Sequence, residues 1–476
     1  MTTLRELLGG QRQVGVLLHV TALPDGCFGG AARRWVELLA RHRVGVWQVL
    51  PLAPTDGTGS PYSSPSGFAL NPQLFDPSDP LPDWTPASYR TYQRWCREQR
   101  LWLHDHCRFM VLRQRFEQVP WWQWPRPLAQ RQGAALRAFD REHASALRQE
   151  AQRQWWLQQQ WSGLRRHAND QGVKLLGDLP FYGAHDSADV WSRPGLFSLR
   201  RDGSLEQQSG VPPDYFSATG QLWSTPVYNW SRHRLNGYRW WLKRLERQLE
   251  LFDLLRIDHF RALAGYWSVP GDDDTAMNGR WLPSPGRAIL ERLRRRCGGR
   301  LPLVAEDLGV ITPDVEALRD QLKLPGMKVL QFAFDGDPAN PYLPHNYGAG
   351  SWVAYTGTHD NATAIGWWQG LPGEGRQQLE SLLGHPVQAP GWELLRLALA
   401  STADLAVVPL QDLMSLDDAA RFNTPGTSSG NWCWQLEGPL DALDGHLAGL
   451  AELARIHHRG GVAAGGASAA GQSGTE

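Results

Sequence analysis

The chain has 476 residues, of which 42% are hydrophobic, enough for one large domain with insertions or for two or three smaller domains. Lysine plus arginine and aspartate plus glutamate both total 48, and this balance gives no electrostatic attraction to nucleic acid or to an anionic membrane. No apolar run is long enough to span a bilayer, and the N-terminus, Met-Thr-Thr-Leu-Arg-Glu-Leu-Leu, is too short and too charged for a signal peptide, so we expect a cytoplasmic protein.

Eight short apolar segments rich in β-branched residues recur along the chain, and a helical pattern follows most of them. They are Val14–Val20, Val44–Leu50, Val173–Leu179, Asp253–Asp258, Leu301–Asp307, Gly326–Phe332, Ser351–Thr356 and Asp404–Leu410. Most lack a regular alternation of apolar and polar residues, as expected for strands that are buried on both faces. We therefore predict an α/β fold, a closed (β/α)8 or TIM barrel, with helical and loop insertions and no separate C-terminal β-domain.

A barrel of this kind usually needs about 250 residues, and the spacing of the segments shows where the extra length lies. We predict a single barrel domain over 1–458, with a helical and loop insertion at 51–170 after the second strand. A loop insertion at 192–232 follows the third strand, and a small insertion occupies 333–350. Insertions after barrel strands build the rim of the site, so these are candidates for a lid or a substrate groove. The Gly/Ala/Ser-rich tail, 459–476, is expected to be disordered.

Tryptophan and cysteine also narrow the possibilities. The 24 tryptophans outnumber the 11 tyrosines, which fits carbohydrate binding because indole rings stack on the apolar faces of sugars. For the two clusters in the helical insertion, Trp121, Trp122 and Trp124, and Trp155, Trp156 and Trp161, packing between helices is the favoured interpretation. The five cysteines are scattered without a Cys-x-x-Cys pair, so neither a disulfide framework nor a structural zinc site is expected.

Three carboxylates stand at the ends of three of the predicted strands: Asp258, Glu306 and Asp360. A parallel barrel presents its chemistry at the carboxyl ends of its strands, and acids that converge there suggest work on a glycosidic bond. Asp258 follows Arg256 by two positions, so both side chains point the same way, and the guanidinium should lower the pKa of Asp258 and hold it as an ionised nucleophile. Glu306 ends an apolar run that would raise its pKa, as a general acid requires.

Each acid also has a purely structural interpretation. Arg256 and Asp258 could form a salt bridge at a strand end, and Glu306 with Asp307 could cap the helix that begins near Pro313. His359 and Asp360 could be a His-Asp dipeptide of the kind common in loops, rather than residues that bind sugar hydroxyls. Asp178, at the end of the third strand, could support the nucleophile or cap a turn. The convergence of four acid-bearing strand ends favours the catalytic interpretation over these alternatives.

Longer motifs around these acids resemble the 4-α-glucanotransferases, also called amylomaltases or disproportionating enzymes, of glycoside hydrolase family 77. The matching segments run from about Gly15 to Leu436. They are Gly-Val-Leu-Leu-His at 15–19, Ser-Pro-Tyr at 60–62, Gly-Asp-Leu-Pro-Phe-Tyr at 177–182, Ala-His-Asp-Ser-Ala-Asp-Val-Trp at 184–191, Gly-Val-Pro-Pro-Asp-Tyr-Phe-Ser-Ala-Thr-Gly-Gln-Leu-Trp at 210–223, Arg-Ile-Asp-His-Phe-Arg at 256–261, Val-Ala-Glu-Asp-Leu-Gly at 304–309, Pro-Gly-Met-Lys-Val-Leu-Gln-Phe-Ala-Phe-Asp at 325–335, Gly-Thr-His-Asp-Asn at 357–361 and Asn-Thr-Pro-Gly-Thr at 423–427.

The resemblance implies a role for each matched position. Asp258 would be the nucleophile, Glu306 the general acid/base, and Asp360 the transition-state stabiliser that holds the sugar at the reacting subsite. The implied substrate-binding residues are Arg256, His359, Asp178, Tyr62, Ser60, Asp214, Tyr215, Phe216, Trp223, His345 and Asn423. One departure is Ser-Thr-Pro-Val-Tyr-Asn-Trp after Trp223, where the family usually has Gly-Asn-Pro-Leu-Tyr-Asp-Trp; it lies on a possible acceptor-side loop.

The implied reaction moves a segment of an α-1,4-glucan to the 4-hydroxyl of an acceptor glucan or glucose by a retaining double displacement, which requires the two carboxyls about 5–5.5 Å apart. The expected partners are α-1,4-glucans and maltooligosaccharides, with no cofactor, no metal, no nucleic acid and no membrane, in a monomer or weak homo-oligomer. Two alternatives stay open: an α-glucan hydrolase on the same barrel, and a non-catalytic glucan-binding protein. The presence of all three acids counts against the second.

Overall fold

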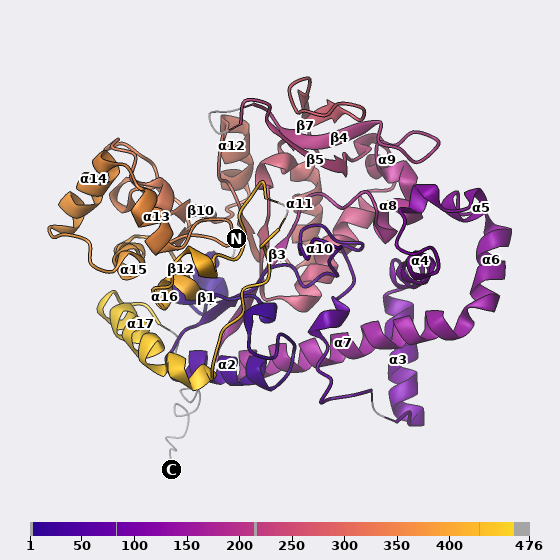
Figure 1. Cartoon of the computed structure of the whole chain (residues 1–476), viewed down its shortest axis with the longest axis horizontal. Coiled ribbons are helices and arrows are strands. Elements are labelled where there is room, and N and C mark those ends of the chain that lie inside the picture. The colour runs from indigo at the N-terminus through magenta and orange to yellow at the C-terminus, as the bar shows by residue number, and fades with distance from the viewer. Residues whose placement is uncertain (1–2, 82, 214–216, 428, 461–476) are drawn as a thin grey trace, which may run out of the picture.

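The fold is built around a ring of eight parallel strands (Figure 1). The computed structural model describes residues 3–81, 83–213, 217–427 and 429–460; the tail expected to be disordered lies almost entirely outside these residues. The ring strands are β1 Gln13–Leu17, β2 Val46–Gln48, β3 Lys174–Leu179, β6 Leu254–Ile257, β9 Leu303–Ala305, β10 Gly326–Val329, β11 Trp352–Tyr355 and β12 Leu405–Pro409. Each overlaps one of the eight predicted segments, so the predicted barrel is confirmed.

The strands follow one another in the order β10-β11-β12-β1-β2-β3-β6-β9, and each neighbouring pair is parallel. Where this order begins and ends, the backbone N–H of Ala305 donates to the carbonyl of Pro325 at 2.8 Å, which brings β9 against the start of β10 and nearly closes the ring. Every residue of β1 and β12 is buried, which explains why these segments read as continuous apolar runs.

Helices surround the ring. They are α1 Leu4–Leu7, α2 Gly30–Arg41, α3 Pro86–Glu98, α4 Leu103–Arg115, α5 Arg126–Ala129, α6 Gly133–Glu142, α7 Ala144–Asp170, α8 Ala188–Ser192, α9 Trp230–Leu235, α10 Arg239–Leu251, α11 Gly286–Arg296, α12 Pro313–Gln321, α13 Ala364–Gly370, α14 Gly373–Leu383, α15 Pro390–Ala400, α16 Leu410–Leu413 and α17 Asp444–Ile456. In α2, Ala32, Trp35, Val36 and Leu39 are buried at the spacing of one helix face, so the helix packs by an apolar stripe.

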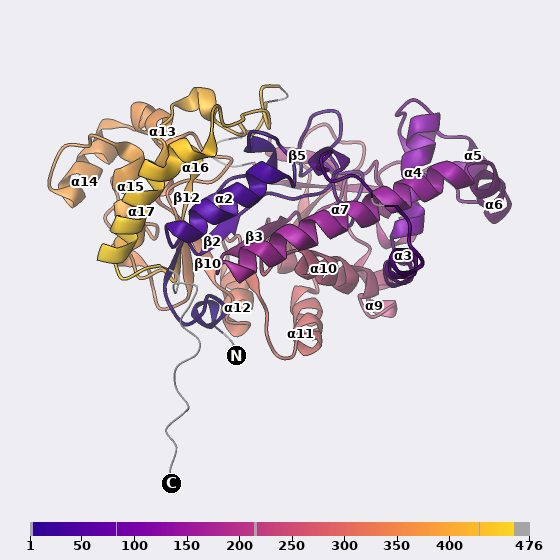
Figure 2. The same ribbon diagram turned by 90° about the horizontal axis from the view of Figure 1, so that it is seen from below.

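The chain between β2 and β3 forms five helices, α3 to α7, that extend to one side of the barrel. The 27-residue α7 runs from α2 out to the smaller helices, as Figure 2 shows. Tryptophan side chains contribute to the packing of this region. Four of them are buried in the core, namely Trp121, Trp124, Trp155 and Trp161, and two pack against the core while partly exposed, namely Trp122 and Trp156. The packing interpretation of the two tryptophan clusters therefore holds.

A second sheet, which the sequence pattern did not reveal, lies beside the barrel at the top of Figure 1. Its antiparallel strands are β4 Gln207–Val211, β5 Gln221–Pro226, β7 Gly265–Pro270 and β8 Arg280–Pro283, in the order β5-β4-β7-β8. The region 192–232, expected to be a turn-rich loop, thus contributes two strands. They escaped notice because β4 is short and polar and because its other neighbour, β7, comes more than fifty residues later in the chain.

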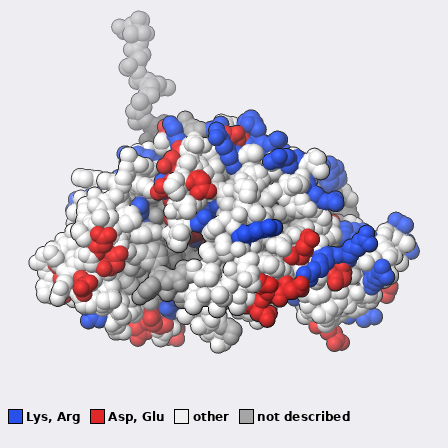
Figure 3. Space-filling model, turned by 90° about the horizontal axis from the view of Figure 1, so that it is seen from above, with Lys and Arg blue, Asp and Glu red and all other residues white. Residues whose placement is uncertain are grey.

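No helix among the described residues is both long and apolar enough to cross a membrane. The face of the molecule in Figure 3 carries both acidic and basic side chains, and wide areas of uncharged residues lie between the charged groups. This distribution agrees with the equal numbers of acidic and basic residues in the chain.

Candidate active site

Two neighbouring ring strands bring Asp178, Arg256 and Asp258 together. Asp178 on β3 is in register with Arg256 on β6, and Asp258 follows β6 directly. The Arg256 guanidinium donates to both oxygens of Asp178, at 3.0 Å through Nε and 2.5 Å through Nη2, and its Nη2 also donates to Asp258 at 3.0 Å. The Arg256 and Asp178 side chains are buried, whereas 30% of the Asp258 side chain is exposed. Arg256 and Asp258 therefore do form the ion pair considered from the sequence, but Arg256 also pairs with Asp178, and Asp258 is the member of the trio that meets solvent.

The expectation of a lowered pKa for Asp258 is wrong. Burial raises the pKa of Asp258 to about 7, and the Arg256 guanidinium opposes that shift without overcoming it. Two further carboxylates, Asp178 and Asp360, push the pKa of Asp258 in the same direction as burial. The sequence argument failed because Arg256 already makes a two-pronged ion pair with Asp178, which leaves Asp258 with only a single contact to this cation.

Glu306 lies at the end of β9, next to β6 in the ring. Its Oε2 accepts a hydrogen bond of 2.6 Å from the backbone N–H of His259, the residue after Asp258. Burial, with the nearby Asp258 carboxylate as the second cause, raises the pKa of Glu306 well above its usual range. The raised pKa expected of a general acid is thus present, and the hydrogen bond from His259 connects Glu306 with the residue that follows Asp258.

His259 adopts a left-handed backbone conformation, with φ of 52° and ψ of 50°. A residue with a side chain enters this region at a cost in free energy, so a neighbouring contact must hold it there. The Glu306 carboxylate supplies such a contact at the N–H of His259, and Trp223 on β5 packs edge-on against the imidazole with ring centroids 4.9 Å apart. Trp223 also lies 5.8 Å from the ring of Tyr182, so β5 reaches the surroundings of His259.

Asp307 has a structural role that differs from the expected cap. Its carboxylate accepts from the N–H of Met327 on β10 at 2.7 Å and from the Arg319 guanidinium of α12 at 2.5 Å. Helix α12 begins after Thr312, and no side chain caps it. Neither Glu306 nor Asp307 caps this helix, because Asp307 instead connects the end of β9 to β10 and to the last turn of α12.

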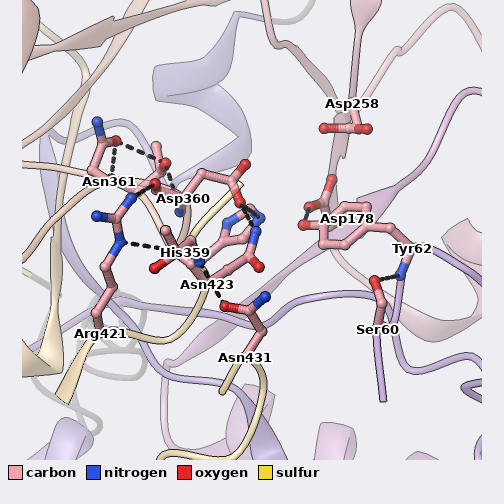
Figure 4. A network of polar contacts seen from close by, with 12 residues as sticks. Ser60, Tyr62, Asp178, Asp258, His359, Asp360, Asn361, Arg421, Asn423 and Asn431 are labelled. Carbon is pink, nitrogen blue, oxygen red and sulfur yellow. Dashed lines mark hydrogen bonds and ion pairs between the residues drawn. The ribbon is translucent and has the colours of Figure 1, made fainter. Parts of the chain in front are cut away.

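Tyr62 connects the surroundings of Asp258 to those of Asp360. Its hydroxyl donates to Asp178 at 2.5 Å, and its ring stacks on His359, with centroids 5.2 Å apart and planes 7° apart. Burial and the adjacent Asp178 carboxylate raise the pKa of the Tyr62 phenol, which stays protonated as a donor. Ser60 accepts from the N–H of Tyr62 at 3.3 Å and so shapes the turn that carries this tyrosine (Figure 4).

Asp360 is half-exposed, and residues of the loop that follows α16 donate hydrogen bonds to it. The amide of Asn423 donates to the Asp360 carboxylate at 2.6 Å, and Nε2 of the buried His359 lies 3.3 Å from the same oxygen. The Arg421 guanidinium donates to the backbone carbonyl of Asp360 at 2.7 Å and, through Nε, to that of Asn423 at 2.8 Å. Figure 4 shows these residues together on one side of the site, with Asp258, Asp178 and Tyr62 on the other.

Of the remaining expected residues, only His345 lies in the described part of the chain, and it is not joined to this network. His345 is exposed on the short 3-10 helix Pro344–Asn346, and no hydrogen bond within the described part of the chain links it to the acids. Asp214, Tyr215 and Phe216 lie outside the described residues.

Sequence reasoning missed Arg421 and Trp432. The indole ring of Trp432 lies 5.7 Å from that of Tyr62 and 6.0 Å from that of His359. The motif Asn-Thr-Pro-Gly-Thr at 423–427 marks the loop that carries both residues and could have directed attention to them. Among the described residues, no group of three or more His, Cys, Asp or Glu side chains is arranged to hold a metal ion.

Comparisons with known proteins agree with this geometry. The family model described as 4-alpha-glucanotransferase matches residues 18–88 and 81–441. The chain is 41% identical to a 4-alpha-glucanotransferase of Synechocystis and 40% identical to one of Thermus thermophilus, in both cases over 94% of this chain and 99% of the relative. The structure of an amylomaltase from Streptococcus agalactiae in complex with acarbose superposes with a TM-score of 0.89 at 31% identity, covering 94% of this chain and all of that one. The chain belongs to the 4-alpha-glucanotransferase family of enzymes.

Proposed function

We propose that the chain transfers segments of α-1,4-glucans by a retaining double displacement in which Asp258 is the nucleophile and Glu306 the acid/base. The observation that carries this proposal is the link between the two acids: Glu306 accepts from the N–H of His259, directly after Asp258. Asp258 attacks the anomeric carbon and forms a glycosyl ester, while Glu306 gives its proton to the leaving glycosidic oxygen. Glu306 then removes the proton from the 4-hydroxyl of an acceptor, which displaces Asp258 and restores the α-1,4 bond.

The two carboxyls have suitable protonation preferences for this sequence. Glu306, with its strongly raised pKa, retains the proton that the first step consumes, while Asp258 titrates near neutrality and is partly ionised at physiological pH. Retention requires the carboxyls about 5–5.5 Å apart, whereas an inverting enzyme would hold them about 6.5–9.5 Å apart. A crystal structure with a bound substrate analogue would measure this separation.

Asp360 is proposed to grip the hydroxyls of the reacting sugar and to favour its distortion in the transition state. The hydrogen bond from Asn423 and the contact with His359 support this role, because they orient the exposed carboxylate. The remaining substrate-binding residues of the proposal are Arg256, Asp178, Tyr62, Ser60, Trp223, His345, Asp214, Tyr215 and Phe216. Arg256 and Asp178 are buried, so they would act on the sugar mainly through Asp258 and Tyr62.

The proposed partners are α-1,4-glucans and maltooligosaccharides, as donors and as acceptors, with the enzyme working as a monomer or weak homo-oligomer in the cytoplasm. Neither nucleic acid nor a membrane is proposed as a partner. Incubation with maltotriose tests transfer against hydrolysis. Transfer gives glucose together with oligosaccharides longer than maltotriose, whereas glucose and maltose alone would show that water is the acceptor and would overturn the proposal.

A further inference from the structure

Trp432 is a half-exposed aromatic residue in the loop between α16 and α17, and it takes part in none of the steps described above. Its ring contacts connect it to the site: the centroids of Tyr62, His359 and Phe422 lie 5.7, 6.0 and 5.7 Å away. Tyr62 and His359 stack on each other and contact Asp178 and Asp360, respectively. The indole therefore extends the aromatic surface that begins beside the acids.

The loop holds Trp432 in a conformation that a tryptophan rarely adopts. Its φ is 65°, in the left-handed region, which is unfavourable for a residue with a side chain. The N–H of Trp432 donates to the carbonyl of Phe422 at 2.7 Å. The preceding Asn431 accepts from the N–H of Thr424 at 2.8 Å and donates to the carbonyl and hydroxyl of Thr427 at 3.1 and 3.0 Å. These contacts fix the direction of the indole despite the unfavourable backbone.

The proposed chemistry assigns a direction to the substrate. Glu306 must lie beside the leaving oxygen, so the side of the site that contains Glu306, His259 and Trp223 is occupied by the leaving group and later by the acceptor. Trp432 contacts a different set of rings, those of Tyr62, His359 and Phe422, and none of these is a ring contact of Trp223 in the described structure. Trp432 thus lies beside the rings that contact Asp178 and Asp360 rather than beside those next to Glu306, so its indole would meet the non-reducing part of the donor.

We propose that the indole of Trp432 is the stacking surface for the donor glucose unit next to the one that Asp258 attacks, on its non-reducing side. This inference rests on the proposed function, because Glu306 defines the direction of the chain. The apolar face of a pyranose ring matches the exposed face of an indole. Binding there favours donors that transfer two or more glucose units over donors that transfer a single unit.

Two activated donors that differ by one glucose test this proposal. α-Glucosyl fluoride fills only the reacting position, whereas α-maltosyl fluoride also reaches the position assigned to Trp432, and fluoride leaves without needing a proton from Glu306. The readout is kcat/KM for α-maltosyl fluoride divided by kcat/KM for α-glucosyl fluoride, with glucose as acceptor. We expect this ratio to fall about tenfold in Trp432→Leu, through KM for α-maltosyl fluoride, and to recover in Trp432→Tyr, which restores an aromatic face.

A merely structural role for Trp432 would give a different result. If the indole only supported Tyr62 and His359, both donors would lose activity together and the ratio would stay at the wild-type value, which would overturn the proposal. Trp84→Leu, on the exposed aromatic surface beside α3, is the matched control and should leave the ratio unchanged. Failure of the proposed function itself would look different again, because the wild type would then form no transfer product from either donor.

Discussion

The carboxylate of Glu306 and the backbone N–H of His259 are joined by a hydrogen bond of 2.6 Å. His259 follows Asp258 directly, and its left-handed backbone turns the chain away from the end of β6. One peptide unit therefore connects the proposed nucleophile on one strand with the proposed acid/base on the next. A shift of either acid along its strand would strain this bond, so the pair is held in one relative position before the substrate arrives.

Glu306 is the proposed acid/base, whereas the adjacent Asp307 makes a structural ion pair, and matching substitutions test these two roles separately. Glu306→Gln keeps the size of the side chain but cannot donate a proton, so kcat for maltotriose should fall by about 10²–10⁴-fold while the melting temperature does not drop. Asp307→Asn should do the reverse. It removes one of the two carboxylates that pair with Arg319, the other being that of Asp320, and should cost about 1–3 kcal/mol of stability, while folded enzyme keeps a kcat close to wild type.

Initial rates of glucose release and thermal melts of the two variants check this pair. α-Maltosyl fluoride provides a control within the same experiment, because its leaving group needs no proton. Glycosyl-enzyme formation from this donor should therefore survive in Glu306→Gln. Equal loss of kcat in both variants would contradict the separation of roles.

Asp258 should carry the glycosyl group during the reaction. In Glu306→Gln, the first step with α-maltosyl fluoride can occur, but the second lacks its base, so the ester should accumulate. Digestion and mass spectrometry should then find one maltosyl group on the peptide that contains Asp258. The double variant with Asp258→Asn should show no such adduct, and a maltosyl group on any other residue would refute the assignment of the nucleophile.

The pH profile of kcat/KM should follow the electrostatics of the trio Asp178, Arg256 and Asp258. Attack needs ionised Asp258, whose pKa is raised to about 7, so activity should decline as the pH falls through this region. The Asp178 carboxylate contributes to raising that pKa. Asp178→Asn should therefore move the acidic limb to lower pH, by up to about one unit, even if the absolute rate also falls.

The control for this shift is Asp253→Asn. Asp253 precedes β6 and pairs with Arg165, so it lies at the other end of the strand from Asp258. The acidic limb of this variant should coincide with that of the wild type. Movement of the limb to higher pH in Asp178→Asn would show that Asp178 does not act on Asp258 by its charge.

The barrel was predictable from sequence because its eight strands are buried on both faces and therefore stand out as apolar runs. The acids were found for a related reason: each interrupts the end of such a run. Residues 207–226 gave no comparable signal, since β4 is short and polar, only one residue of β5 is buried, and both strands form a sheet with strands that come after β6. The place of these strands depends on pairing between distant segments, which local periodicity does not record.

The electrostatics of the site were only half predictable. The raised pKa of Glu306 follows from the apolar run that precedes it, whereas the pKa of Asp258 depends on a competition that spacing cannot reveal. Arg256 stands two residues before Asp258 on the same strand, but its main partner, Asp178, comes from the neighbouring strand. Similarly, Arg421 and Trp432 reach the site from a loop about sixty to seventy residues after His359, so only the folded chain shows their contacts.

The raised pKa of Asp258 also predicts how its replacement changes stability with pH. The folded-state value of about 7 exceeds the value of about 3.9 expected in the unfolded chain, so the folded state binds the proton more tightly. The contribution of the Asp258 carboxyl to the free energy of unfolding is fully present below about pH 4 and is lost as the pH rises toward 7. Because 30% of the side chain is exposed, we expect the loss to be about 1–3 kcal/mol. Asp258→Asn avoids it, so the variant's melting temperature relative to wild type should rise by about 1–4 °C between pH 4 and pH 8. Thermal melts of wild type and Asp258→Asn measure this difference in melting temperature, with Asp253→Asn as the control. If the difference stayed constant or decreased as the pH rises, ionised Asp258 would not destabilise the folded state.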